Sequence, residues 1–465
     1  MNKKNRFSLG PAILVTAAFI GPGTVLTASK AGAGYGFVLL WAVAFSVIAT
    51  IILQVMAARI GIVTGDGLSQ AMKSSVANPF LRVAMLGLVL VAILVGNAAY
   101  QTGNILGAAK GVSALTQAES KNESVETEPR INDAVKSESA GSEPAAWSGI
   151  ESNNPIWTLQ NTLVVAIGCV ALAVIWIGRF DILQGLLTAL VALMSVLFIV
   201  AAIQCKPNWA QVLAGFAPRI PTGSELFIVG LIGTTVVPYN LFLHASAAAQ
   251  RWDFLNSESV ESETKKAIRL SRWDTVISVL IGGAVTAAIL ITASVAFYVV
   301  SGDAVGLAEG TKGADAVAVQ LEPVLGSWAK SMYAIGLCAA GLTSAITAPI
   351  AAGYAASGCF GWSGRLSDWR LKSIASLVVV TGVLLGVLLG KSPTETIILA
   401  QVANGLLLPI IAVMLLIMAN QTKLMNQFRN STAANIAGVI VIGVTILIGF
   451  KNLALAYGKI SELLQ

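Results

Sequence analysis

Long apolar runs alternate with short polar and charged stretches along nearly the whole chain. Most runs reach the length of about 20 residues that an α-helix needs to cross the hydrocarbon core of a bilayer. We therefore expect eleven membrane-spanning helices. They cover residues 9–29, 36–58, 81–108, 161–178, 182–203, 225–249, 274–300, 328–356, 371–389, 393–419 and 432–456.

Composition supports a membrane protein and argues against a soluble enzyme. Hydrophobic residues make up 56% of the chain and charged residues 11%, whereas ordinary globular domains carry about 25% charged residues. The net charge of +6 does not indicate nucleic-acid binding, because 17 of the 29 Lys and Arg residues fall in loops on one side. The positive-inside rule makes that side cytoplasmic. We expect a multi-pass protein of the cytoplasmic (inner) membrane, with its N-terminus inside and its C-terminus outside.

One segment, residues 114–157, departs from this composition. It carries eight acidic and three basic residues among many Ser, Asn and Pro, and such a stretch buries too little apolar surface to fold alone. We expect a disordered extracytoplasmic loop between spans three and four. Its charge could concentrate cations near an entrance, although a solvated insertion without a function is the simpler interpretation.

Two of the expected spans contain a break near their middle. Proline and glycine interrupt the first at residues 21–24, and proline among polar residues interrupts the sixth at residues 234–240. Unwound backbone at membrane depth is tolerated only where it faces protein or a water-filled cavity. Single proline kinks are common, but two matched breaks five spans apart are typical of a transporter with inverted repeats and a midplane site. The candidate substrate-binding residues are Gly21, Pro22, Gly23, Thr24, Thr234, Val237, Pro238, Tyr239 and Asn240.

Several motifs resemble the Nramp family of divalent-metal transporters over almost the whole chain, residues 114–157 excepted. They are Gly21-Pro-Gly-Thr, Lys30-Ala-Gly-Ala-Gly-Tyr-Gly, Gln54-Val-Met-Ala-Ala-Arg-Ile-Gly-Ile-Val-Thr-Gly, Asn240-Leu-Phe-Leu-His244, Gly341-Leu-Thr-Ser-Ala-Ile-Thr and Gln401-Val-Ala-Asn-Gly-Leu-Leu-Leu-Pro409. The resemblance implies an all-α LeuT-like fold with alternating access and broken helices 1 and 6. This fold contains two inverted five-helix repeats, about 9–203 and 225–419, and an eleventh helix at 432–456. The resemblance also implies that Gln401 faces the substrate cavity.

The resemblance fails at the family's metal ligands. The family pattern Asp-Pro-Gly-Asn reads here with Gly21 and Thr24 at its outer positions, and the family's Met is replaced by Val237. A transition metal needs ligands of matching softness and some negative charge, and these side chains supply neither. The metal ligands therefore remain unknown.

The family's proton route is altered as well. Its two third-span carboxylates correspond to Gln101 and Asn104, and amides do not take up a proton near neutral pH. The only histidine, His244, matches a family histidine and could carry a proton or simply pack between helices. These three residues are the candidates for coupling.

Three functions remain open. The first is a Nramp-like secondary transporter, a symporter by resemblance, that moves a cation. Its cargo is nominally divalent, with Mg²⁺ favoured over Mn²⁺ because Mg²⁺ keeps several waters. The second moves a small organic or amino-acid-like solute on the same fold, and the third is a sensor or receptor without transport. We expect a monomer in the lipid bilayer, without cofactor or enzymatic activity.

Overall fold

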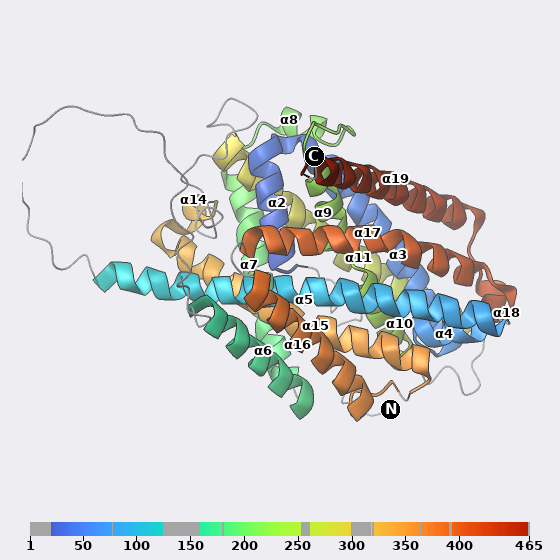
Figure 1. Ribbon diagram of the computed structural model, residues 1–465. Helices are drawn as coiled ribbons and strands as arrows, with labels where there is room; N and C mark the ends of the chain where they lie inside the picture. Colours follow the sequence, from blue (N-terminus) through green and yellow to red (C-terminus); the bar gives the residue numbers. More distant parts are fainter. Residues whose placement is uncertain are drawn as a thin grey trace, which may run out of the picture.

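The computed structural model describes residues 20–76, 78–123, 159–178, 181–252, 261–298, 318, 320–362, 364–389 and 393–463, and every regular element in this part of the chain is helical. The long helices are α3 (Leu40–Thr64), α5 (Pro79–Glu123), α6 (Leu159–Ile177), α7 (Asp181–Gln204), α11 (Glu261–Ala293), α15 (Ala329–Phe360), α16 (Trp369–Leu389), α17 (Pro393–Asn420) and α19 (Thr432–Leu463). Shorter helices are α2 (Pro22–Tyr35), α4 (Leu68–Ser75), α8 (Trp209–Ala214), α9 (Glu225–Thr235), α10 (Pro238–Arg251), α14 (Glu322–Leu325) and α18 (Thr422–Met425). The expected all-α polytopic architecture is confirmed (Figure 1).

Nine helical segments of the described chain are long and apolar enough to cross a membrane. One of them, Pro22–Thr64, contains residues 22–29 of the first expected span and all of the second, joined by a turn at Gly36 whose φ is +59°. The eleventh expected span is α19, in which Thr432–Leu447 forms a shorter apolar helix. Residues 9–19 of the first span lie outside the described residues.

Two boundaries differ from the sequence-based expectation by more than ten residues. Helix α5 continues to Glu123, so the segment expected to begin as a loop at residue 114 is helical for its first ten residues. This stretch is rich in Ala, Leu, Gln, Glu and Lys, which are good helix formers. Helix α11 begins at Glu261 rather than at 274, because the charged and polar stretch before the apolar run, which includes Lys265, Lys266 and Arg269, is helical as well. Residues 124–158 lie outside the described part of the chain.

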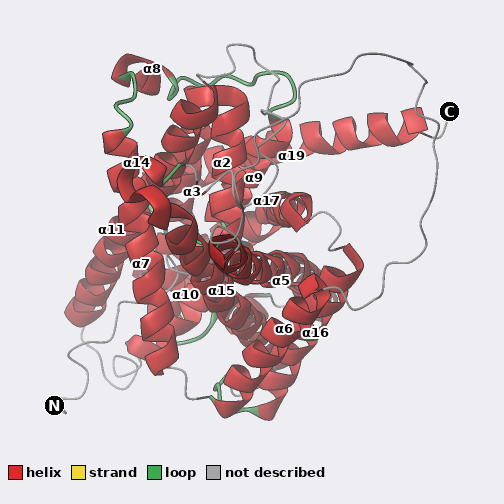
Figure 2. Ribbon diagram, turned by 90° about the vertical axis from the view of Figure 1, so that its left-hand side faces the viewer, coloured by secondary structure: helices red, strands yellow, loops and turns green. Residues whose placement is uncertain are grey.

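Helices α5 and α15 pack along each other at the centre of the bundle, and α6 and α16 lie together on one flank (Figure 2). Small residues allow this close approach. A Cβ atom on Gly341 of α15 would lie 2.6 Å from the Ala108 nitrogen, and one on Gly111 of α5 would lie 2.6 Å from the Cys338 nitrogen. Glycine contacts of this kind are typical of helix packing in lipid.

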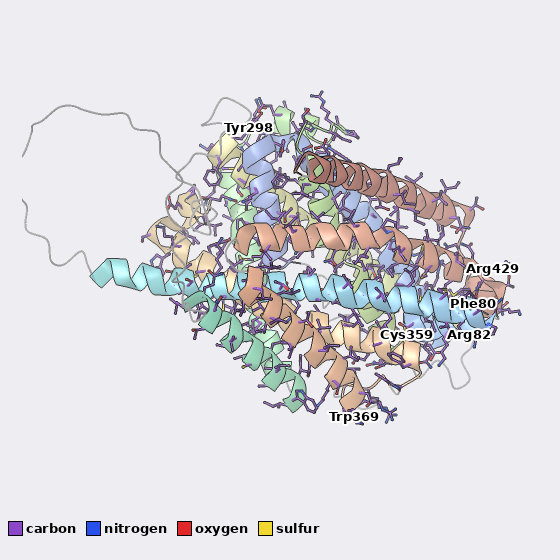
Figure 3. The ribbon with its side chains drawn as sticks, in the orientation of Figure 1. Phe80, Arg82, Tyr298, Cys359, Trp369 and Arg429 are labelled. Carbon is purple, nitrogen blue, oxygen red and sulfur yellow. The ribbon has the colours of Figure 1, made fainter. Side chains whose placement is uncertain are left out.

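One end of the bundle gathers the loops that the charge pattern places inside the cell. Arg59, at the end of α3, hydrogen-bonds Asn430, and the Gln421 side chain donates to the Ser75 carbonyl over 3.2 Å. Figure 3 shows Phe80, Arg82, Cys359 and Arg429 on the same side of the molecule, away from Tyr298. The expected sorting of loops to two ends agrees with this arrangement.

Candidate functional site

The break in the sixth span is a two-residue gap between helices. Helix α9 ends at Thr235, Val236 and Val237 have non-helical backbone angles, and α10 begins with Pro238 at its first position. Helix α2 likewise begins with Pro22 at its first position, after Gly21 in extended conformation. Proline suits both places because the first residues of a helix have no intrahelical partner for their N–H groups. Each break therefore presents a helix N-terminus, and the second also presents the C-terminal carbonyls of α9.

The first break faces two hydroxyl-bearing side chains from neighbouring helices. A Cβ atom added to Gly21 would lie 3.2 Å from Ser344 Oγ, 3.4 Å from Tyr100 Oη and 3.8 Å from Asn104 Oδ1. Tyr100 also contacts Tyr239 of the second break, with ring centroids 5.3 Å apart and planes tilted by 59°. Tyr100 of α5 therefore links the two breaks.

Gln401 of α17 links the breaks a second time. A Cβ atom on Gly23 would lie 2.0 Å from Gln401 Nε2, so the Gln401 side chain rests directly on the backbone of the first break. A Cβ atom on Gly233, two residues before the end of α9, would lie 1.9 Å from the Gln401 carbonyl oxygen. A side chain at Gly233 would collide with the backbone of α17, whereas one at Gly23 would displace the Gln401 side chain.

Buried amide groups surround the breaks. Among the described residues, neither amide atom of Asn240 or Gln401 has a hydrogen-bond partner, and the Asn104 and Asn404 nitrogens have none either. All four side chains are almost fully buried. Buried polar groups in folded proteins are nearly always hydrogen-bonded, so these donors and acceptors are available to cargo or water. Together these four side chains carry no charge and offer both hydrogen-bond donors and acceptors.

The other predicted substrate-binding residues lie in the two breaks or in the helix turns beside them. Pro22 packs on α5, since a Cβ on Gly107 would lie 2.2 Å from Pro22 Cβ. Thr24 is buried in the first turn of α2, and Thr234 donates a hydrogen bond to the Leu231 carbonyl within α9. Val237 is buried in the gap itself.

The three coupling candidates separate in space. Asn104 faces Gly21 as described above, whereas the Gln101 amide donates to the Ala345 carbonyl over 2.9 Å and its Cγ packs against Gly382 of α16. His244 Nδ1 lies 2.7 Å from Gln54 Oε1 of α3. The structure therefore brings Asn104 to the first break and directs Gln101 and His244 to other helix interfaces.

Tyr100 and Ser344 were not among the residues predicted from the sequence. A signal for each was present: Tyr100 lies one turn before Asn104 on α5, and Ser344 belongs to the Gly341-Leu-Thr-Ser motif. In the described part of the chain, no group of three or more His, Cys, Asp or Glu side chains could hold a metal ion. Any cation at the breaks would therefore meet neutral oxygen atoms.

Comparison with known protein families gives a match over most of the chain. Residues 12–123 and 155–455 match the family described as Nramp, natural resistance-associated macrophage protein-like. The chain belongs to the Nramp family. The expected resemblance is thereby confirmed, and the unmatched residues 124–154 fall within the acidic segment.

Curated relatives of this Nramp chain include two bacterial proteins, each named divalent metal cation transporter MntH. The protein from Brucella suis biovar 1 (strain 1330) is 26% identical over 449 residues, which are 95% of this chain and 86% of the relative. The protein from Deinococcus radiodurans is 25% identical over 435 residues, with 93% and 86% coverage. These relatives are transporters, which agrees with the expectation of a transporter rather than an enzyme.

Solved structures confirm the LeuT-like fold. A mutant of the Eremococcus coleocola manganese transporter superposes with a TM-score of 0.68 at 20% identity, over 97% of this chain and 88% of that protein. MhsT in complex with L-phenylalanine gives a TM-score of 0.57 at 16% identity, over 97% of this chain and all of that one. At these identities the likeness shows the fold alone.

Proposed function

We propose that this chain is a Nramp-family transporter that moves a cation, in the first instance a divalent metal ion, by alternating access. The cargo site lies where the two breaks meet and lacks the Asp, Asn and Met ligands of the family pattern. The observation that carries the proposal is the double link between the breaks, through Tyr100 and through Gln401. The curated relatives named as divalent metal cation transporters support the choice of cargo.

The chemistry of the site favours an ion that keeps water. A bare divalent ion in a low-dielectric medium needs negative charge around it, and the side chains at the breaks are neutral. Unpartnered amide nitrogens would repel a bare cation, whereas the unpartnered amide oxygens of Asn240 and Gln401 can accept hydrogen bonds from the water molecules that coordinate it. Mg²⁺ usually keeps several waters in protein sites, so we favour Mg²⁺ over Mn²⁺ as the cargo.

Transport into proteoliposomes tests this function. We expect saturable uptake of Mg²⁺ or Mn²⁺ above that of empty vesicles, reported by an ion-sensitive dye inside. With the membrane potential clamped, unlabelled ion preloaded in the vesicles should accelerate the uptake of labelled ion, as expected for exchange by alternating access. No uptake of either ion at millimolar concentration would overturn the proposal.

We predict that Gln401→Leu strongly reduces uptake while the protein still folds. Leucine has similar volume but removes both amide atoms that rest on the first break. Losing hydrogen bonds to a charged or hydrated cargo costs about 1.5–3 kcal/mol, which corresponds to a decrease in affinity of about 10- to 100-fold. The measurement is the half-saturating ion concentration, and Gln427→Leu in the loop before α19 serves as the control. An unchanged value for Gln401→Leu would remove this residue from the site.

A second candidate is a small organic or amino-acid-like solute, and one observation favours it. Asn240 and Gln401 each present an unpartnered donor and acceptor beside two helix N-termini, and such a set could bind a solute that carries a carboxylate and an amine. MhsT, whose structure holds L-phenylalanine, has the same fold. Binding of an amino acid without competition from divalent ions would favour this candidate. We do not favour a sensor or receptor, because the relatives are named as transporters.

Topology is part of the proposal: the N-terminus lies inside the cell and the C-terminus outside. The charge pattern and the gathering of basic loops at one end support it. An alkaline-phosphatase fusion to the C-terminus should be active in cells, because this enzyme works only outside the cytoplasm. A fusion active only as a cytoplasmic reporter would contradict the orientation.

A further inference from the structure

A cavity of about 200 Å³ lies away from the two breaks, at the end of the bundle where α3, α10 and α15 finish. Its wall comes from the α3–α4 turn, from α4, from the last turns of α10 and α15, and from the segment that leads to α16. Figure 3 labels Cys359, the neighbour of the lining residue Gly358, on this side of the molecule. The residues that carry its chemistry are Asp66, Gln70, Ser246, Gln250, Tyr354 and Trp362.

Asp66 is the only carboxylate in this wall. Its backbone groups interact with Thr64 Oγ, but among the described residues none forms a hydrogen bond or an ion pair with its carboxylate. Burial raises the pKa of Asp66 above its ordinary value, because desolvation disfavours the charged form. An unpartnered carboxylate that is partly removed from water is stabilised by a cation.

The rest of the wall presents neutral oxygen donors around this charge. Gln70 and Gln250 are exposed at the rim, and Ser246 and Tyr354 are half-buried. Glycine lets the elements of the wall approach one another closely: a Cβ on Gly67 would lie 2.7 Å from Ser246 Oγ, and one on Gly358 would lie 2.6 Å from Ser69 Cβ. One carboxylate with amide and hydroxyl oxygens is a donor set for a hard cation.

Two helix faces connect this cavity with the breaks. On α10, Tyr239 at the break and Ser246 and Gln250 at the cavity lie on one face, at spacings of seven and four residues. On α15, the same helical spacing runs from Ser344 at Gly21 through Thr347 and Ala351 to Tyr354 and Gly358. Because α10 packs against α15, these two helices join the breaks to the cavity.

The volume suits an ion with its first water shell. Six waters occupy about 180 Å³ at about 30 Å³ each, and six is the usual coordination number of Mg²⁺. The cavity of about 200 Å³ can hold such an ion without stripping it.

We propose that this cavity is a second cation site, in which Asp66 holds a hydrated divalent ion at one mouth of the transport route. The assignment of the site to the transport route rests on the proposed function, whereas ion binding in the cavity does not. Asp66 attracts the ion through its charge, and Gln70 accepts hydrogen bonds from the coordinated waters.

A cysteine placed at the rim tests directly whether the charge of Asp66 makes the potential in the cavity negative. In a cysteine-free background, Gln250→Cys reports the local potential through its reaction rates with cationic and anionic methanethiosulfonates of similar size. We expect Asp66→Asn to lower the cationic-to-anionic rate ratio by roughly 25-fold, because one charge about 4 Å away in water changes each of the two rates about fivefold, in opposite directions. Glu263→Gln removes an exposed carboxylate from the start of α11, at the same end of the bundle, and should leave the ratio unchanged.

Ion binding is read from the same reporter. Mg²⁺ or Mn²⁺ should slow modification by the cationic reagent in the Asp66 protein and have no effect in the Asp66→Asn protein. An unchanged rate ratio in Asp66→Asn, or an absence of protection by both ions, would overturn the second site. An unchanged melting temperature in detergent shows that the Asp66→Asn protein is folded.

Transport assays separate this proposal from the proposed function. If both hold, Asp66→Asn raises the half-saturating ion concentration for uptake from this side by about fivefold, as expected for the lost charge, and leaves the maximal rate unchanged. Protection without any transport would contradict the proposed function and leave the site in place. Transport with an unchanged half-saturating concentration and no protection would contradict the site alone.

Discussion

The double variant Gly21→Asp/Thr24→Asn is expected to bind Mn²⁺ at least about 100-fold more tightly than the unmodified chain. Replacing even an outer partner of a metal ligand typically changes affinity 10- to 100-fold, and this variant adds a charged ligand directly. The backbone tolerates the change, because Gly21 has φ −106° and ψ −179°, values open to any residue. Isothermal titration of the detergent-solubilised protein measures the affinity.

The space at Gly21 is also suited to a carboxylate. The nearest atoms to an added Cβ are Ser344 Oγ and Tyr100 Oη, at 3.2 and 3.4 Å. Both are hydroxyl groups, which can donate hydrogen bonds to a carboxylate and stabilise its charged form. The Ser344 contact is somewhat tight, so this side chain must move by a few tenths of an ångström.

The isosteric variant Gly21→Asn/Thr24→Asn separates charge from shape. It should fill the same space without raising the affinity for Mn²⁺, since an amide adds no negative charge. Equal binding by the Asp and Asn variants would contradict the view that the missing carboxylate decides metal affinity. Unchanged weak binding by both would mean that Val237, in place of the family's methionine, also limits the site.

The sequence predicts the breaks well because their causes are local. Proline at positions 22 and 238 lacks an N–H group and fits only the first turn of a helix, so it marks the residue at which each second half begins. The membrane spans can be predicted equally well, because a run of apolar residues determines each of them without reference to the rest of the chain. The family motifs then supply the arrangement of the helices.

The neighbours of each break could not be predicted in the same way. Gln101 and Asn104 are separated by three residues, yet Gln101 bonds the Ala345 carbonyl whereas Asn104 faces Gly21. The rotation of α5 against α15 and α16 decides between these directions, and that rotation depends on many packing contacts at once. Tyr100 joins the site for the same reason.

The acidic segment shows a limit of composition as evidence. Its polar, charged sequence argues against a packed core, but residues 114–123 continue α5 because their helix propensity is high and an existing helix is extended at little cost. Composition alone does not locate the boundary between the helix and the segment that follows it.

Gly233→Ala is expected to abolish transport and to destabilise the protein. The added methyl group would lie 1.9 Å from the Gln401 carbonyl oxygen and 2.8 Å from the Gly405 nitrogen. Both atoms belong to the backbone of α17, so no side-chain rotation relieves the contact and α9 must move away from α17. Overpacking of this kind costs about 1–3 kcal/mol. Thermal unfolding in detergent should show a melting temperature lower by about 2 °C or more.

The same displacement explains why transport is lost rather than merely weakened. Gln401 touches the second break through its backbone and the first through its side chain, which rests on Gly23. Moving α17 away from Gly233 therefore changes the position of the Gln401 amide at the first break as well, and both halves of the site lose their alignment.

Gly87→Ala is the matched control for this prediction. Gly87 lies inside α5 with no atom within 4 Å of an added Cβ, and alanine is favoured over glycine in a helix by about 1 kcal/mol. Its melting temperature should stay the same or rise slightly, with uptake unchanged. Full uptake by Gly233→Ala would mean that α9 and α17 can separate without consequence. The contact of Gln401 with both breaks would then be a packing feature, and the cargo site would have to be sought on the side of Tyr100 and Ser344 instead.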